Sequence, residues 1–227
     1  MEKIVKLLSE IPLFRGLKDN QMDQIRQIAK DRFYDRGKAI FFEGDPGNGF
    51  YAVLEGRVKI YKVSLDGKEQ ILHICGPGNP FGEVPVFSGE NFPANAQTLL
   101  KSHLLFFPRD AFIELISRNP SLAMNMLAFL SMRLRQFTIQ IENLSLKEVP
   151  GRLASYLVFL MAEQDSEEKV SLAISKGQLA SLLGTIPETL SRILSKMSGS
   201  GLIQVSGREI VITDRPGLED LAETGKL

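Results

Sequence analysis

The sequence predicts an α+β fold with three consecutive parts: an N-terminal β-roll of the jelly-roll type, a long helix and a C-terminal winged helix-turn-helix. Three observations predict it. Glycine-separated β-type runs fill residues 33–108, a long stretch without Gly or Pro follows Pro120, and two short helical segments flank Gly184. We place the β-roll with its N-terminal helices at 1–118, the long helix at 119–145 and the winged helix-turn-helix at 146–227.

The composition is that of an ordinary globular protein and excludes several classes. Apolar residues make up 44% and charged residues 24% of the 227 residues, and Lys+Arg equals Asp+Glu at 27 each. The single cysteine, Cys75, excludes an intramolecular disulfide, a four-cysteine iron–sulfur cluster and a cysteine-based structural zinc site. Neither a signal peptide nor an apolar run of about 20 residues is present. We therefore expect a cytoplasmic protein without membrane contact.

Two short helices are predicted ahead of the β-roll. Apolar residues at helical spacing over 4–11 mark the first, Pro12 interrupts it, and residues 19–29 fit the second. Within the β-roll, glycines recur at intervals of roughly 7–12 residues, a rhythm typical of jelly rolls. Asp66-Gly67 separates two β-type runs and predicts a hairpin turn.

The long helix carries an apolar stripe that favours contact with a second copy of the chain. Its members recur three or four positions apart, which approaches the heptad seam of a two-stranded coiled coil. The predicted dimer interface comprises Met126, Leu130, Leu134, Phe137, Ile141 and Leu144. The same spacing also allows the alternative, a helix packed on its own β-roll.

The C-terminal part predicts a winged helix-turn-helix. After a helix over 152–163 and a charged loop over 164–169, Ser175 can cap a helix that ends at Leu183. Gly184 can supply a left-handed turn, and Pro187 fits the first turn of a second helix. A β-hairpin follows and turns at Ser206-Gly207, which makes the wing.

The order of these parts and four short motifs resemble the CRP/FNR family of bacterial transcription regulators. The motifs are Phe42-Glu43-Gly44-Asp45, residues 51–58, Pro80-Phe81-Gly82-Glu83 and Glu188-Thr189-Leu190-Ser191-Arg192. The segments 145–147, 187–189 and 207–210 are most similar to the branch of nitric-oxide-responsive regulators of nitrate respiration. The resemblance covers essentially the whole chain. It implies a homodimer that binds an inverted repeat in double-stranded DNA, works with RNA polymerase and is switched by an effector in the β-roll.

The second helix of the helix-turn-helix has the chemistry of a base-reading helix. Glu188 can accept from cytosine N4, and Arg192 on the same face can donate to guanine O6 and N7. Ser191 can contact a base or the region of a thymine methyl group. The resemblance implies TTGAT-like half-sites. Further expected DNA contacts are Thr189, Ser175, Lys176, Gln178 and Lys196. The alternative is an ordinary i,i+4 Glu–Arg ion pair on a solvated helix.

The effector is less well specified than the DNA contacts. Gly82-Glu83 matches the part of the family's cyclic-nucleotide site that holds the ribose, but Pro93-Ala94 stands where the family has the phosphate-binding Arg-Ser. We therefore do not expect cyclic AMP to bind. The candidate effector pocket comprises Gly82, Glu83, His73 and Phe92.

Since one cysteine cannot hold an iron–sulfur cluster, the resemblance implies haem as cofactor and nitric oxide as its signal. The available axial donors are His73, His103, Cys75, Met124, Met126 and Met132, and none of them is assigned. The alternative is a cyclic-nucleotide-dependent regulator, or a regulatory subunit of another protein. The sequence lacks a phosphate-binding loop ending in Gly-Lys-Ser/Thr, a His-Glu-x-x-His zinc motif and a Gly-x-Ser-x-Gly elbow, so we expect no enzymatic activity.

Overall fold

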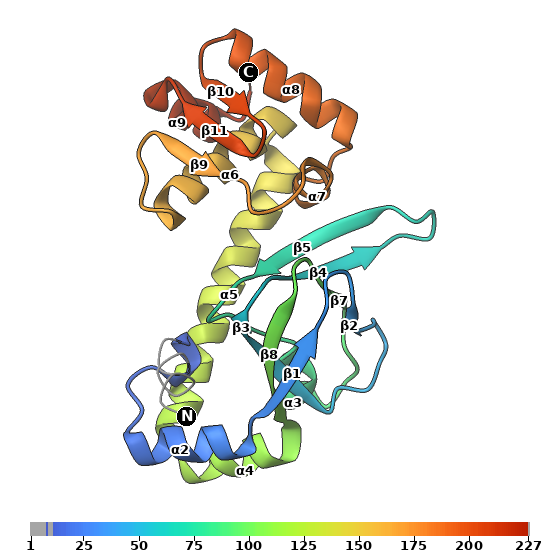
Figure 1. Ribbon diagram of the computed structural model, residues 1–227, viewed down its shortest axis with the longest axis vertical. Coiled ribbons are helices and arrows are strands. Elements are labelled where there is room, and N and C mark those ends of the chain that lie inside the picture. The colour runs from blue at the N-terminus through green and yellow to red at the C-terminus, as the bar shows by residue number, and fades with distance from the viewer. Residues whose placement is uncertain (1–7, 9–10, 227) are drawn as a thin grey trace. The chain divides into compact units, whose positions relative to one another are not determined.

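The computed structural model describes Leu8 and residues 11–226, so the first predicted helix lies almost entirely outside the described residues. The chain divides into two compact units, Met1–Leu134 and Arg135–Leu227, and each is described by itself (Figure 1). No helix among the described residues is long and apolar enough to cross a membrane.

The first unit is built on two antiparallel four-stranded sheets, with strand orders β1-β8-β3-β6 and β2-β7-β4-β5. The strands are β1 (Lys30–Tyr34), β2 (Ala39–Phe41), β3 (Gly49–Glu55), β4 (Val58–Val63), β5 (Glu69–Cys75), β6 (Pro80–Phe81), β7 (Asn95–Thr98) and β8 (Ser102–Pro108). This arrangement confirms the predicted β-roll. The first strand begins three residues earlier than expected, because Lys30 pairs with Phe106 of β8.

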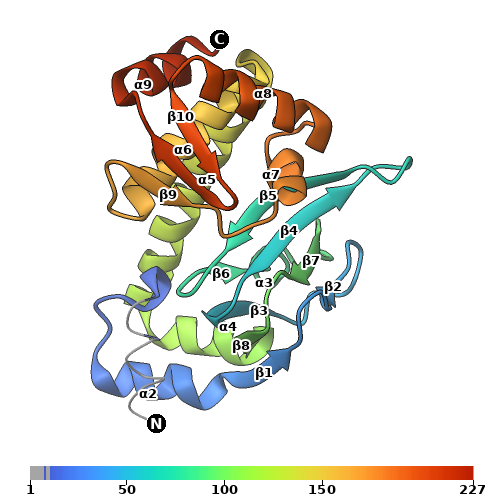
Figure 2. The same ribbon diagram turned by 45° about the horizontal axis from the view of Figure 1, so that its top comes forward.

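The predicted hairpin at Asp66-Gly67 is present. It joins β4 to β5, pairs Val63 with Glu69 and places Gly67 at a φ of +82°, where a residue without Cβ is favoured. The two strands extend as a long hairpin in both views of the molecule (Figures 1 and 2).

Aromatic packing holds the helices of the first unit to one sheet. These helices are the 3-10 turn η1 (Pro12–Phe14), α2 (Asp19–Ile28), α3 (Val84–Ser88) and α4 (Arg109–Arg118). Phe107 of β8 lies 4.8 Å from Phe50 of β3 and 5.5 Å from Phe14, measured between ring centroids. Phe112 of α4 meets Phe50 edge-on at 4.6 Å. The three helical elements η1, α2 and α4 therefore close one end of the roll around a shared aromatic core.

The long helix α5 (Pro120–Leu146) uses its first half for this same core. Met126 is only 3% exposed, and Leu130 packs partly buried beside it. Within one chain, Met126 is covered by its own β-roll and Leu130 partly so, which leaves the exposed members farther along α5 to carry most of the predicted dimer interface. Farther along, Leu134 is 67% and Ile141 65% exposed. The apolar stripe thus serves two different surfaces.

The second unit joins four helices to a small antiparallel sheet of order β10-β11-β9 (Figure 2). Its elements are α6 (Val149–Glu163), β9 (Lys169–Ser171), α7 (Lys176–Leu182), α8 (Pro187–Gly199), β10 (Ile203–Ser206), β11 (Glu209–Ile212) and α9 (Arg215–Thr224). This confirms the winged helix-turn-helix. One detail differs: Lys169, expected in a loop, begins β9, because Lys169 and Val170 pair with β11.

One side chain, Arg152 of α6, connects three segments of this unit. Its guanidinium donates from Nη2 to the carbonyl of Leu144 at 3.0 Å, from Nε to that of Lys147 at 2.9 Å and from Nη1 to that of Leu183 at 2.9 Å. Leu144 and Lys147 lie at the end of α5, and Leu183 is the C-cap of α7. The last carbonyls of a helix have no partner within the helix, so Arg152 satisfies two helix ends at once.

Replacing Arg152 by Lys should lower the free energy of unfolding by about 1–3 kcal/mol, because a single ammonium group cannot reach three carbonyls in a planar fork. Urea unfolding followed by circular dichroism measures the change. Arg215→Lys is the matched control, since Arg215 lies on the surface with Glu219 one turn away. An Arg152→Lys protein as stable as wild type would show that these three bonds contribute little.

Candidate nucleic-acid interface and effector site

Helix α8 separates its buried and exposed residues cleanly. Leu190, Leu194 and Met197 are buried and pack the helix onto its unit. Glu188, Ser191 and Arg192 are exposed, with Lys196 one turn beyond them. The predicted base-reading residues therefore share one solvent-facing surface, with the acidic side chain in the first turn of the helix, where the helix dipole favours it.

The predicted contacts on α7 have a second role in the structure. The Ser175 hydroxyl accepts from the backbone N–H of Gln178 at 3.2 Å, and the side-chain Oε1 of Gln178 accepts from the backbone N–H of Ser175 at 2.9 Å. This reciprocal capping box fixes the start of α7. Lys176 is exposed beside it, whereas Thr189 of α8 is half-buried.

The wing presents a basic residue at its tip. Arg208 is exposed in the turn between β10 and β11, and its carbonyl accepts from the backbone N–H of Leu172 at 2.8 Å. Lys169 of β9 forms an ion pair with Glu209 of β11 at 2.7 Å. Strand β9 thus pairs with the wing and stabilises it. The charged residues before Val170 had predicted a loop at this position.

Two of the four predicted effector-pocket residues lie against an aromatic cavity of the β-roll. A Cβ on Gly82 would come within 3.1 Å of the ring of Phe92 and 3.2 Å of that of Phe41, so the backbone passes close to both rings. Phe41 and Phe92 stack with their centroids 3.7 Å apart. The cavity has a volume of about 330 Å³ and is lined by Ile40, Phe41, Asp45, Pro46, Asn48, Tyr51, Phe92 and Phe106.

The other two, Glu83 and His73, lie around a side chain that the sequence analysis missed. Arg133 of α5 contacts His73 Nε2 of β5 and donates to the carbonyl of Pro80 at 3.1 Å. Burial, with the nearby Arg133 guanidinium, lowers the pKa of His73 to about 3. Burial raises the pKa of Glu83 despite the same guanidinium, and raises that of Cys75 to about 12.

The sequence carries one signal for Arg133, its position in the helix. It follows Met126 by seven residues and Phe129 by four, which places it on the face of α5 that packs against the β-roll. A charged residue on an apolar helix face needs polar partners, and these are His73 of β5 and the carbonyl of Pro80 of β6.

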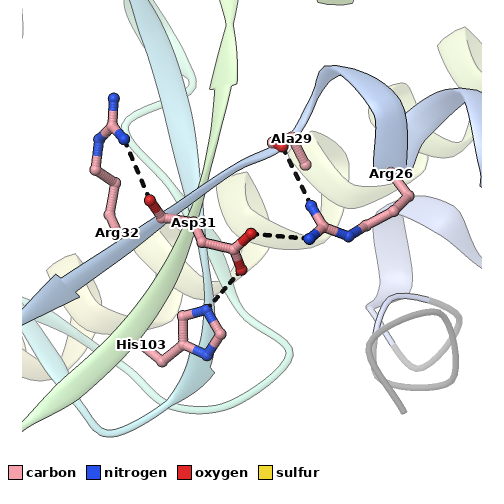
Figure 3. Close-up of polar contacts among 5 residues, drawn as sticks. All are labelled: Arg26, Ala29, Asp31, Arg32 and His103. Carbon is pink, nitrogen blue, oxygen red and sulfur yellow. Dashed lines mark hydrogen bonds and ion pairs between the residues drawn. The ribbon is translucent and has the colours of Figure 1, made fainter. Parts of the chain in front are cut away.

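His103 of β8 is held in a polar cluster on the first sheet (Figure 3). Its Nε2 donates to one carboxylate oxygen of Asp31 at 2.8 Å, and the other oxygen accepts from Arg26 at 2.8 Å. These bonds hold the pKa of Asp31 below its ordinary value, although partial burial opposes them. The ring of Phe33 stacks on His103 with a centroid distance of 4.2 Å.

Comparison with known proteins covers both units. Residues 31–119 match the cyclic nucleotide-binding domain and residues 151–221 the Crp-like helix-turn-helix domain. The cyclic AMP receptor protein of Thermus thermophilus is 32% identical over 93% of this chain and 96% of its own length. The chain belongs to the CRP/FNR family of transcription regulators. Members of this family bind DNA through the helix-turn-helix, so the exposed face of α8 is the candidate nucleic-acid interface.

Solved structures of CRP/FNR proteins share this architecture. FixK2 from Bradyrhizobium japonicum is 26% identical, with a TM-score of 0.77 over 86% of this chain and 97% of its own. DNR from Pseudomonas aeruginosa is 35% identical, with a TM-score of 0.52 over 97% of this chain and 98% of its own.

The neutral His73 should make folding sensitive to acid. Its pKa is lower in the folded protein than the ordinary value of about 6.5, so its contribution is complete above pH 6.5 and is lost as the pH falls toward 3. We expect the free energy of unfolding to fall less steeply between pH 7 and pH 5 in His73→Gln than in wild type. Denaturant titrations over this range measure the slopes.

The raised pKa of Glu83 acts in the opposite direction, because protonation then favours the folded state. Glu83→Gln therefore serves as the control. In this variant the free energy of unfolding should fall more steeply with decreasing pH than in wild type. Identical slopes in wild type and His73→Gln would contradict a buried neutral His73.

Proposed function

We propose that this CRP/FNR regulator binds as a homodimer to an inverted repeat of TTGAT-like half-sites and is switched by an effector in its β-roll. The observation that carries the proposal is the exposed face of α8, where Glu188, Ser191 and Arg192 stand together. Because its target would be chromosomal DNA, we place the protein in the cytoplasm. We also propose that it contacts RNA polymerase at the promoters that it regulates.

The readout follows from the chemistry of the three side chains. Arg192 can make a bidentate contact with guanine, Glu188 can accept from the amino group of cytosine, and Ser191 adapts to either role. Pro187 precedes them and carries no side-chain donor, so the half-site has one guanine contact fewer than an arginine there would give. Further contacts to the DNA backbone would come from Lys176, Lys196, Thr189, Ser175 and Gln178.

Arg192→Ala should weaken binding by about 1–3 kcal/mol per half-site and relax the preference for one guanine. Fluorescence anisotropy with the repeat and with duplexes altered at each position measures both effects. Arg215→Ala, on the surface of α9 outside the helix-turn-helix, is the control and should bind like wild type. A wild-type protein that binds the repeat and a scrambled duplex equally would overturn the readout.

The dimer proposal rests on the exposed second half of α5. Leu127, Leu134 and Ile141 repeat at intervals of seven, and Phe137 lies between them. Together with the half-buried Leu144 they form a largely exposed apolar stripe. A second copy of α5, presenting the same stripe, would bury it.

Leu134→Glu should convert the dimer to a monomer at micromolar concentration and abolish binding to the inverted repeat, since it places charge in the seam. Sedimentation velocity and anisotropy measure the two effects. Ile139 is 49% exposed but lies on the opposite side of the heptad, so Ile139→Glu should stay dimeric. A wild-type protein that sediments as a monomer would contradict the dimer.

Haem with nitric oxide is the effector that the resemblance implies, and the described donors do not fit it. The Nε2 atom of His73 is held by Arg133 and that of His103 by Asp31, while Cys75 is buried with a raised pKa. The methionines at 124 and 132 are exposed, and Met126 lies in the core.

The alternative, a cyclic nucleotide, lacks a partner for its phosphate at Pro93-Ala94. The aromatic cavity beside Phe92 is a hollow in the β-roll, and its volume of about 330 Å³ is at the lower end of the range for small organic ligands. We derive no step of the switch through haem or a nucleotide.

An absorption titration of the purified protein with haem should give no saturable Soret band at one haem per subunit, because the histidines are engaged. Calorimetric titration with cyclic AMP should likewise show no stoichiometric binding. A saturable band that shifts with nitric oxide would establish the haem sensor, and a stoichiometric heat with cyclic AMP would establish the cyclic-nucleotide regulator.

A further inference from the structure

We infer that Ile186 and Pro187 form an apolar tip that reads the 5-methyl group of a thymine in each half-site. The inference rests on the proposed DNA binding and adds a specificity determinant to it. The apolar tip means these two residues, at the N-terminal end of α8.

Exposure is the first observation. Ile186 is 52% exposed, and Pro187 is exposed beside it. Among the described residues beyond α5, Ile186 and Phe159 are the exposed large apolar side chains. An apolar side chain left in water at the start of a base-reading helix gains free energy when a ligand covers it.

Rigidity is the second observation. Ile186 is the N-cap of α8 in extended backbone, with φ −107° and ψ 155°, and its carbonyl accepts from the N–H of Leu190 at 3.0 Å. Thr185, immediately before it, donates from its N–H to the carbonyl of Ala180 at 2.9 Å. A β-branched side chain and a proline ring on fixed backbone lose little conformational freedom on contact.

The chemistry of the tip selects its target. Neither side chain can donate or accept a hydrogen bond, and Pro187 lacks a backbone N–H. Of the groups that base pairs present in the major groove, the thymine methyl is the apolar one. Glu188 and Arg192 follow Pro187 by one and five positions and read hydrogen-bonding edges of bases. The apolar tip and these polar residues would therefore contact different base pairs of the half-site.

The test compares thymine with 2′-deoxyuridine, which pairs identically and lacks only the 5-methyl group. Full-length protein is titrated by anisotropy against the inverted repeat, with each thymine replaced in turn in both half-sites. Wild type should lose affinity about tenfold or more at one thymine position when both methyl groups are removed, since burying one such group is worth about fourfold. At that position Ile186→Ser and Pro187→Ser should bind both duplexes with nearly equal affinity.

Phe159→Ser is the matched control, because it removes an equally exposed apolar side chain from α6 and should keep the wild-type discrimination. The inference is overturned if wild type prefers the repeat over a scrambled duplex yet is indifferent to every methyl group. It is also overturned if both tip variants weaken binding equally with and without the methyl group. A wild type that does not prefer the repeat at all overturns the proposed DNA readout itself.

Discussion

The bonds of Arg152 are the interaction on which the arrangement of the DNA-binding unit depends. One planar guanidinium satisfies carbonyls at the end of α5 and at the C-cap of α7 while its own backbone lies in α6. The turn of the helix-turn-helix is therefore tied to the segment that leaves α5. Displacement of that segment strains the two bonds to Leu144 and Lys147 and, through the shared guanidinium, the bond to Leu183, which couples the end of α5 to the turn that precedes α8.

A second arginine has a comparable role in the β-roll. Arg133 brings a positive charge to a region where Glu83 is buried and His73 is neutral, and it joins α5 to β5 and β6 through side-chain and backbone contacts. A ligand that entered near Glu83 would change the partners of Arg133. The residues around Glu83 and the long helix thus share a polar contact through Arg133, in addition to the apolar core around Met126.

The heptad stripe of α5 shows the limit of periodicity as evidence. Spacing of three and four identifies an apolar helix face, but it does not say which neighbour covers each turn. Met126 and Leu130 pack on their own β-roll, whereas Leu134 and Ile141 stay exposed. The division falls where the β-roll ends, and that boundary depends on contacts between residues far apart in the chain.

The sequence by itself determined the β-roll, the long helix and the winged helix-turn-helix, because turns, caps and apolar periodicity are local properties. It also identified the exposed face of α8, since an amphipathic helix separates Leu190 and Leu194 from Glu188 and Arg192. Only the tertiary structure decided that Arg133 meets His73, that Arg152 caps two helix ends and that β9 joins the wing. These contacts join residues that are distant in sequence, and local pattern carries no information about them.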